Sequence, residues 1–301
     1  MRFVITGASG FIGTALCSRL LTNGHSLTLL THAAPPSANT QMTKWHHWTP
    51  GTPGDWEKLL DGADGVINLA GEPIAAKRWT PSQKRKIRAS RINATSSLVA
   101  AIANAARKPA FLLNASAVGY YGPHGDETIT EESPPGNDFL SSVCREWEEE
   151  AKNAEPLGVR VMRVRTGIVL GRGGGALAKM VLPFKFFVAG PLGSGDQWMP
   201  WIHMEDEVGL MIYLIENESA GAFNATAPNP VRMDEFCRTL GKVMGRPSWL
   251  GAPAFALRLA LGEMAEMLLT GQRAVPAAAQ KLGYEFKYPS LDAALQACMP
   301  L

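Results

Sequence analysis

Short apolar runs alternate with amphipathic segments through the first half of the chain. Residues 1–5, 26–30 and 65–71 are rich in Val, Ile and Leu, and each run predicts a buried strand. Helical spacing of apolar residues lies between them, most clearly over 81–106. Such alternation predicts a parallel sheet with helices on both faces, and right-handed crossovers then give a doubly wound α/β (Rossmann) fold.

The same alternation continues to Arg165 and then changes. Runs at 110–116 and 159–165 predict two more strands, with a helix at 142–154 between them. Residues 167–175 are rich in glycine, and the rest of the chain is mostly helical apart from a strand predicted at 221–225. We therefore expect a second, smaller, mostly helical lobe on the substrate side.

The predicted boundaries interleave the two parts. The sheet domain takes residues 1–166, with 203–227 returning to it, and the smaller lobe takes 167–202 and 228–301. We expect two or three helices after residue 231. Residues 255–269 either cap the pocket or form the subunit contact of a homodimer.

The first strand leads directly into a turn with glycines three residues apart. Gly7, Gly10 and Gly13 stand between that strand and an amphipathic helix. A turn without side chains lets the backbone approach a pyrophosphate, and the free N–H groups of the helix N-terminus attract its charge. Without a ligand, Gly10 and Gly13 would only weaken the helix. The turn therefore predicts a nucleotide site.

Several segments, in the right order, resemble the extended short-chain dehydrogenase/reductases. They are residues 6–13, 68–71, 91–95, 116–122, 167–171 and 201–206, and they cover nearly the whole chain. More narrowly, residues 68–74, 78–80, 119–122, 173–176 and 192–195 are similar to an atypical "epimerase family" branch of sugar-nucleotide-epimerase-like NADP-binding proteins.

This resemblance implies a dinucleotide that lies across the ends of the strands. The pyrophosphate would contact Gly7, Gly10, Phe11, Ile12 and Gly13. The ribose and adenine side would meet the backbone of Leu69, Ala70 and Gly71, and the nicotinamide would approach Ile168.

The residues after the second strand favour NADP over NAD. NAD enzymes usually carry an acidic residue there for the ribose 2′-hydroxyl, whereas this chain has Thr31 and His32. A carboxylate would repel a 2′-phosphate, so its absence permits NADP. Lys86 and Arg91 either supplement His32 as phosphate contacts or face solvent.

The resemblance also implies a Tyr-x-x-x-Lys pair that this chain lacks. The expected helix has Phe139 or Leu140 near the tyrosine position and Val143 or Cys144 near the lysine position. In the family the tyrosine transfers the proton while the nicotinamide carries the hydride. Another group must therefore replace the pair, or the protein is not a conventional dehydrogenase.

Four residues are candidates for that role. Ser116 lies where the family has a hydrogen-bonding Ser or Thr, and Tyr120 is preferred over Tyr121 as the phenol that reaches substrate. Aromatic packing is the alternative for both tyrosines. His203 faces the expected pocket, although a packed, hydrogen-bonded histidine is the favoured interpretation.

Composition narrows the kind of binding partner and the cellular compartment to be expected. The chain has 301 residues, a net charge of +2 and four cysteines without Cys-x-x-Cys spacing, which favours a small-molecule substrate over nucleic acid or a membrane, and a reducing compartment. The segment 250–269 is interrupted by charges and predicts an amphipathic helix. With no signal peptide before the first strand, we expect a cytoplasmic protein.

Other catalytic arrangements find little support. His46 and His47 lack a third ligand at metal spacing, so no metal site is predicted. The acidic run at 146–150 is interpreted as a solvated helix face. Two functions stay open: an NADP-dependent oxidoreductase or epimerase acting on a carbonyl, alcohol or sugar nucleotide, and a dinucleotide-binding regulatory or sensor protein.

Overall fold

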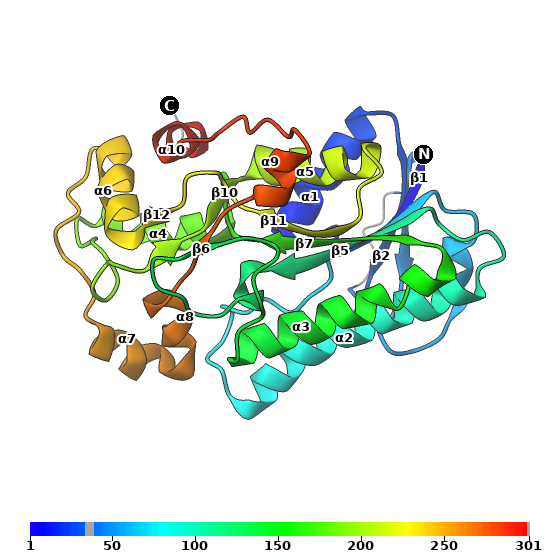
Figure 1. Ribbon diagram of the computed structural model, residues 1–301, viewed down its shortest axis with the longest axis horizontal. Coiled ribbons are helices and arrows are strands. Elements are labelled where there is room, and N and C mark those ends of the chain that lie inside the picture. Colours follow the sequence, from blue (N-terminus) through cyan, green and yellow to red (C-terminus); the bar gives the residue numbers. More distant parts are fainter. Residues whose placement is uncertain (34–38, 300–301) are drawn as a thin grey trace.

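The computed structural model describes residues 1–33 and 39–299, and its centre is a seven-stranded sheet with every strand parallel to its neighbours (Figure 1). The strand order is β11-β7-β5-β4-β1-β2-β3. The strands are β1 (Arg2–Thr6), β2 (Ser26–Thr31), β3 (Thr43–His47), β4 (Gly65–Asn68), β5 (Phe111–Ala117), β7 (Arg160–Thr166) and β11 (Gly221–Ala225). This is the predicted doubly wound fold, which is confirmed.

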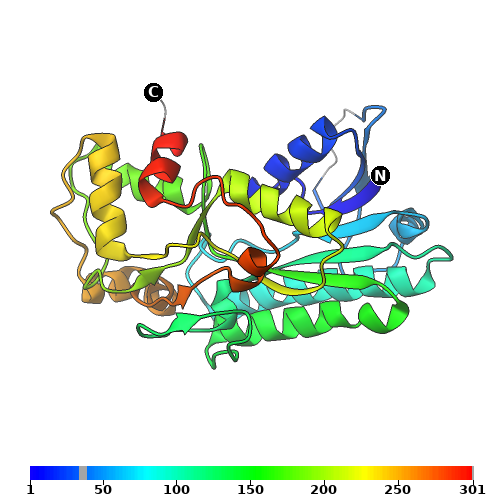
Figure 2. The ribbon, with the colours of Figure 1, turned by 45° about the horizontal axis from the view of Figure 1, so that its top comes forward.

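Two pairs of helices cover the two faces of this sheet (Figure 2). One face carries α1 (Phe11–Thr22) and α5 (Met204–Glu216), and the other carries α2 (Pro81–Asn104) and α3 (Phe139–Lys152). Because side chains alternate along a strand, each strand feeds both layers. Leu113 of β5 packs in the α1/α5 layer, and its neighbour Leu112 packs in the α2/α3 layer.

The smaller lobe lies beyond the carboxyl ends of the strands and has its own core. Trp201, Phe236 and Leu295 are fully buried there. Its elements are β8 (Ile168–Leu170), α4 (Gly175–Lys185), β9 (Trp198–Met199), β10 (Trp201–His203), β12 (Val231–Arg232), α6 (Met233–Met244), α7 (Ala254–Leu261), η4 (Gly262–Ala265), α8 (Glu266–Leu269), β13 (Arg273–Ala274) and α10 (Leu291–Cys298). Helix α9 (Ala277–Lys281) lies between them in the chain but packs against β11, in the α1/α5 layer of the sheet. Short elements elsewhere are η1 (Asp55–Leu60), η2 (Val118–Tyr120), β6 (Thr128–Ile129) and η3 (Glu155–Leu157).

Two predictions about these elements are wrong, and one strand was missed. Five α-helices, not two or three, follow residue 231 in the described part of the chain. The helix predicted over 250–269 is broken because Gly262 adopts a φ of 63°. Strand β3 was not predicted, since an edge strand that exposes Lys44 and His47 has little apolar signal.

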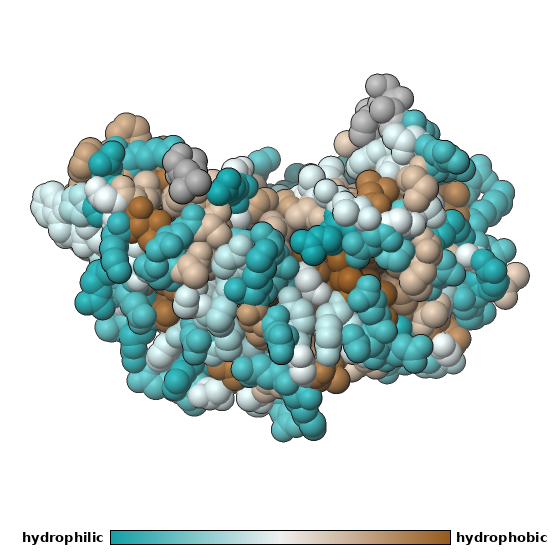
Figure 3. Space-filling view, turned by 90° about the horizontal axis from the view of Figure 1, so that it is seen from above, coloured by the Kyte–Doolittle hydropathy of each residue, from teal (hydrophilic) through white to brown (hydrophobic). Residues whose placement is uncertain are grey.

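The face seen in Figure 3 is mostly hydrophilic, with hydrophobic residues in small areas. Within residues 1–33 and 39–299, no helix combines the length and the apolarity that crossing a bilayer requires. The proline-rich segment after β2 includes residues 34–38, which lie outside the described residues.

Candidate functional site

The glycine turn between β1 and α1 touches the loop that follows β4. Gly7 has a φ of 70°, and a Cβ placed on it would lie 2.5 Å from the carbonyl carbon of Leu69. A Cβ on Gly13 would lie 2.2 Å from the carbonyl oxygen of Gly7. Both positions therefore require glycine, and the turn and the 69–71 loop form one backbone surface.

A buried polar network holds that loop in place. The Thr6 hydroxyl donates to Asn68 Oδ1 at 2.6 Å, and Asn68 Nδ2 donates to Thr95 Oγ1 at 2.9 Å and to Asn114 Oδ1 at 2.7 Å. All four side chains are fully buried. The network joins the carboxyl ends of β1 and β4 to the middle of β5 and to α2, so it positions Leu69, Ala70 and Gly71 beside the turn.

The N-terminus of α1 carries no side-chain cap. Gly10 is the N-cap, and no acidic residue lies in the first turn. The backbone N–H groups of Phe11, Ile12 and Gly13 have no partner within the helix, as at every helix start. The Phe11 ring lies under the glycine loop of the smaller lobe, where a Cβ on Gly174 would approach it to 2.6 Å. The turn thus offers backbone N–H groups to an anion, next to the glycine-rich loop of the smaller lobe.

The candidates for a 2′-phosphate are not all brought together. Thr31 is buried at the end of β2, whereas His32 is exposed beside it. Lys86 is exposed on α2, about 140° around the helix axis from Arg91. The two cations therefore face different directions.

Arg91 lies close to the 69–71 loop. A Cβ on Gly71 would be 3.1 Å from its guanidinium carbon. Its Nη1 donates to the carbonyls of Ile87 at 2.9 Å and Glu72 at 3.2 Å, and its guanidinium lies over the Trp147 ring. Burial lowers the pKa of Arg91. Among the described residues no carboxylate lies within ion-pair distance of it, so its charge is not neutralised by a side chain.

Ser116 belongs to a buried ionic network at the ends of β5 and β7. Its hydroxyl donates to Glu148 Oε1 at 2.7 Å. Arg165 donates two hydrogen bonds to the same carboxylate, from Nε to Oε1 at 2.7 Å and from Nη2 to Oε2 at 2.8 Å. Arg163 Nη1 lies 3.6 Å from Oε2. Ser116, Glu148 and Arg165 are all nearly inaccessible to solvent.

Glu148 contradicts the interpretation of residues 146–150 as a solvated helix face. Its side chain is buried with Val143, Cys144, Trp147 and Ala151 on one side of α3. Two signals in the sequence could have identified it. Glu148 lies four residues after an apolar position, on the face that packs inward. Strand β7 also carries Arg163 and Arg165 at alternate positions, and buried charges require partners.

The two tyrosines differ sharply in their surroundings. Tyr121 is fully buried, its hydroxyl donates to Asn224 Oδ1 at 2.6 Å, and it accepts from Arg165 Nη1 at 2.9 Å. Tyr120 is half-buried, and the Arg165 guanidinium carbon lies 3.5 Å from the centre of its ring. Tyr121 is thus a structural residue, while Tyr120 stays the preferred catalytic tyrosine.

The helix that would carry Tyr-x-x-x-Lys offers no substitute at those positions. Phe139 packs edge-on against the Trp79 ring at 5.3 Å. Cys144 is buried, and burial raises the pKa of its thiol to about 12, so it stays protonated. Replacement groups must come from other elements.

A second buried carboxylate, not identified from the sequence, lies on the other face of the sheet. Glu207 of α5 is fully buried, and its Oε1 accepts from the Thr166 hydroxyl at 2.7 Å. Its Oε2 has no hydrogen-bond partner among the described residues. Burial raises the pKa of Glu207 to about 8, and the bond from Thr166 only partly opposes this. Glu207 is therefore protonated at neutral pH.

Two further predicted residues occupy the junction with the smaller lobe. Ile168 begins β8, and its N–H donates to the carbonyl of Pro200 at 2.7 Å. His203 caps α5, because its Nδ1 accepts from the Glu205 N–H at 3.2 Å. Its ring lies 3.9 Å from that of Tyr288. The structure gives His203 both packing and a hydrogen bond.

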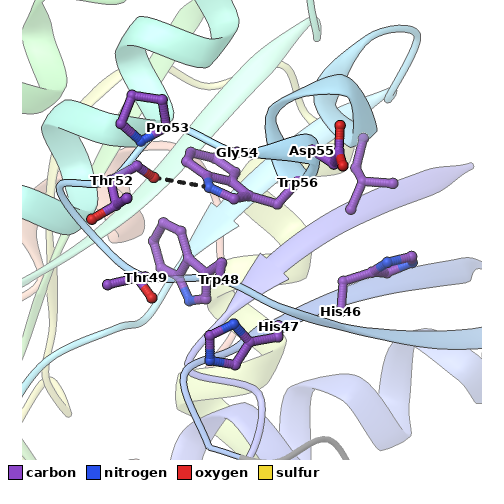
Figure 4. A pocket seen from close by; sticks show the side chains of 10 residues that line it. His46, His47, Trp48, Thr49, Thr52, Pro53, Gly54, Asp55 and Trp56 are labelled. Atoms are coloured by element: carbon purple, nitrogen blue, oxygen red, sulfur yellow. Dashed lines mark hydrogen bonds between the residues drawn. The ribbon is translucent and has the colours of Figure 1, made fainter.

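A surface depression of about 430 Å³ lies away from Ser116, beside β3 (Figure 4). It is lined by residues 46–49, residues 52–56 and Leu59, and the Trp56 indole N–H donates to the Thr52 carbonyl at 3.2 Å. His47 pairs in register with Thr31, so the depression adjoins the adenosine side of the predicted site. No cluster of three or more His, Cys, Asp or Glu side chains suited to a metal exists in the described residues.

Comparisons with known proteins cover both lobes. The model of the NAD dependent epimerase/dehydratase family matches residues 3–226, and a domain of unknown function, DUF1731, matches 252–298. The chain is 45% identical to the "Epimerase family protein SDR39U1 homolog, chloroplastic" of Arabidopsis thaliana, over 99% of this chain and 87% of that protein. It is 41% identical to the epimerase family protein YfhF of Bacillus subtilis, over 98% and 97%.

A solved structure is also similar along the full length. The crystal structure of human epimerase family protein SDR39U1 (isoform 2) with NADPH superimposes with a TM-score of 0.87 at 34% identity, covering 99% of both chains.

Proposed function

This chain belongs to the NAD dependent epimerase/dehydratase family, as an atypical extended short-chain dehydrogenase/reductase, and we propose that it is an NADP-dependent oxidoreductase or epimerase. Its substrate is a small molecule with an alcohol or carbonyl group at the reacting carbon. One observation carries this proposal. The glycine turn, the 69–71 loop and Ser116 all lie at the carboxyl edge of one parallel sheet, which is where such folds bind ligands.

The residues present fit a dinucleotide. Gly7 and Gly13 let the turn pack closely against its own backbone and the 69–71 loop, and the uncapped start of α1 supplies N–H groups for the pyrophosphate. The cofactor is NADPH or NADP⁺, since no acidic side chain follows β2 and the human relative was solved with NADPH. His32 and Arg91 would contact the 2′-phosphate. When bound, the nicotinamide donates or accepts a hydride.

The hydrogen-bonding role of the Ser116 hydroxyl toward a substrate is fixed by its contact with Glu148. A carboxylate only accepts hydrogen bonds, so the bond to Glu148 uses the single proton of the Ser116 hydroxyl. Ser116 then offers lone pairs to the site and accepts a hydrogen bond from a substrate hydroxyl. Arg165 is bound by Glu148 and stacks on the Tyr120 ring, so it orients that ring. The Tyr120 phenol is then the remaining group that can donate or accept a proton.

The missing Tyr-x-x-x-Lys pair supports a second candidate, a dinucleotide-binding sensor without turnover. Phe139 and Cys144 transfer no proton, so catalysis depends on Ser116 and Tyr120 alone. For either function, four free, buried cysteines support a reducing compartment such as the cytoplasm.

Cofactor binding is tested by calorimetry with NADPH and NADH on Gly7→Ala, with Gly24→Ala as the control. Both glycines have positive φ, but a Cβ on Gly24 meets nothing within 4 Å. We expect Gly7→Ala to weaken NADPH binding at least about 100-fold and Gly24→Ala to leave it unchanged. Gly10→Ala is the second variant if Gly7→Ala does not fold, because Gly10 has a φ of −75° and its Cβ would come no closer than 3.2 Å to the Gly7 carbonyl oxygen. If the wild-type protein shows no heat of binding with NADPH or with NADH, the proposal is wrong.

Turnover is tested by nicotinamide absorbance, with alcohols plus NADP⁺ and carbonyls plus NADPH. We expect Ser116→Ala and Tyr120→Phe each to lower kcat by roughly 100-fold, and Tyr213→Phe, whose hydroxyl bonds the Leu282 carbonyl, to keep it. Tight NADPH binding without turnover across the panel supports the sensor instead.

A further inference from the structure

One end of the smaller lobe exposes an unusual number of large apolar side chains. The described chain has eleven exposed large hydrophobic residues, and eight of them lie in two segments, 182–188 and 249–259. They are Leu182, Phe186, Phe187, Val188, Trp249, Leu250, Phe255 and Leu259, which we call the apolar face. Trp249, Phe255 and Leu259 are 70%, 74% and 80% exposed.

The two segments lie side by side. The Leu250 N–H donates to the carbonyl of Ala189 at 3.0 Å, and Leu192 bridges to Ala252 in parallel orientation. Helix α7 begins two residues later, and no residue of α7 is buried. In Figure 1 both α4 and α7 lie at the end of the molecule away from the N-terminus. The apolar face is thus one region assembled from two parts of the chain.

Phe187 adds an independent observation. It follows the C-cap of α4 with a φ of 61°, a left-handed conformation at the helix end where glycine is favoured. Its ring is half exposed, and its aromatic contact in the described structure is the Arg246 guanidinium at 4.5 Å. Packing within one chain therefore does not explain a strained phenylalanine at this position.

The size of the apolar face matches a subunit contact. Large apolar side chains present roughly 150–250 Å² each when exposed, so these fractions leave on the order of 1,000 Å² of apolar surface. Monomers usually expose patches of only a few hundred Å². A stable interface buries about 800 Å² per partner.

We propose that the apolar face is the interface between two copies of this chain. A two-fold contact must be self-complementary, and apolar side chains meet that requirement because their association has no direction. Charges beside α7 have both signs: Arg258 pairs with Glu266, and Lys84 pairs with Glu263, each at 2.7 Å. This mixed border suits a second copy better than an anionic lipid surface, which would select cations alone.

Sedimentation of the full chain tests the proposal. We expect a dimer in the wild type, and a dissociation constant at least about tenfold higher in the double variant Phe255→Ser with Leu259→Ser. Leu282→Ser is the matched control, because Leu282 is 43% exposed but lies outside the apolar face. Its dissociation constant is expected to equal that of the wild type.

Phe187→Gly separates association from folding. Glycine relieves the left-handed strain, so the Tm of the monomer is expected to be unchanged or raised by about 1–3 °C, while dimer dissociation increases at least about tenfold. A merely structural Phe187 would give the opposite pattern, with lower Tm and unchanged association.

Three results would overturn the proposal. The first is a wild type that stays monomeric up to about 100 µM. The second is a dimer that persists in every variant of the apolar face. The third is a monomer that co-sediments with phosphatidylserine-containing vesicles, which would assign the face to a lipid surface.

Discussion

Two buried glutamates, Glu148 and Glu207, meet consecutive residues of one strand from opposite faces of the sheet. Glu148 of α3 binds Arg165, and Glu207 of α5 binds Thr166. Both carboxyl groups are shielded from water. Their neighbours differ, because Glu148 has guanidinium groups and a hydroxyl around it whereas Glu207 has one hydroxyl.

The difference shows that the partner, not burial, decides the charge. Burial alone would lower the pKa of Arg165, yet the hydrogen bonds and charge of Glu148 raise it. Around Glu207 no cation opposes burial, so its pKa rises to about 8. The α2/α3 side of the sheet edge therefore holds an ionic network that fixes the Ser116 hydroxyl, and the α1/α5 side holds a neutral carboxyl.

The largest expected effect is that of Glu148→Ala. It leaves Arg165 and Arg163 buried without a carboxylate, so the free energy of unfolding should fall by about 3–5 kcal/mol. Urea denaturation measures this loss. The control Glu149→Ala removes an exposed neighbour on α3 and should change stability by less than about 0.5 kcal/mol. A loss below about 1 kcal/mol for Glu148→Ala would contradict the ionic role.

Glu207→Gln should act with a pH dependence. In the wild type the carboxyl of the unfolded chain ionises near the ordinary glutamate pKa of 4.5, whereas the folded one retains its proton up to about 8. The folded state then binds more protons, so wild-type stability falls as pH rises from about 4.5 to 8 and levels off above. Glutamine resembles the neutral carboxyl and removes this decline.

At pH 9 we therefore expect Glu207→Gln to be more stable than the wild type by on the order of 1–3 kcal/mol. The two proteins should be similar at pH 5. Thermal unfolding across this range measures both values, and parallel pH profiles would contradict a protonated Glu207.

Thr166→Val tests the environment of Glu207 through its one hydrogen-bond partner, and its expected effect is smaller. It removes the one hydrogen bond that lowers the pKa of Glu207, so the pH at which wild-type stability stops falling should move upward. The lost bond should reduce stability by about 1 kcal/mol. Thermal unfolding from pH 5 to 10 measures the shift, and a downward shift would contradict the assignment.

Ser116→Ala should have a small effect on stability, similar to that of Thr166→Val. Glu148 keeps both bonds to Arg165 after the hydroxyl is removed, so the free energy of unfolding should fall by only about 0.5–1.5 kcal/mol. Urea denaturation beside Glu148→Ala measures the contrast. An equal loss in both variants would mean that Ser116, rather than Arg165, satisfies the carboxylate.

Local patterns predicted most elements of the sheet. The strand expected at 221–225 has those bounds as β11, and the helix expected over 81–106 ends at Asn104. Helix α3 starts earlier than expected because Asp138 caps it, accepting from the Ser141 N–H at 2.7 Å. The errors have two causes: β3 has a weak apolar signal, and Gly262 divides the apolar segment 250–269.

Some residues of the candidate site could be predicted from local sequence, and others could not. Gly7 and Gly13 could be identified from spacing alone, because the need for a missing Cβ is a property of the turn itself. Glu148 could not be identified from spacing alone, because it lies in a charged run beside the exposed Glu149. Its sequence signals are indirect: the apolar face of α3 and the two arginines of β7. Tyr120 and Tyr121 are adjacent in sequence, and the fold alone separates them.

The amino-acid sequence by itself determined the parallel sheet, the nucleotide turn and the absence of an acidic residue after β2, because each depends on residues close together in the chain. The tertiary structure alone decided which carboxylate is ionic and which is neutral. Glu148 meets Arg165 across 17 residues, and Glu207 meets Thr166 across 41. A buried charge is set by the groups that packing brings within a few ångströms, and no local pattern records them.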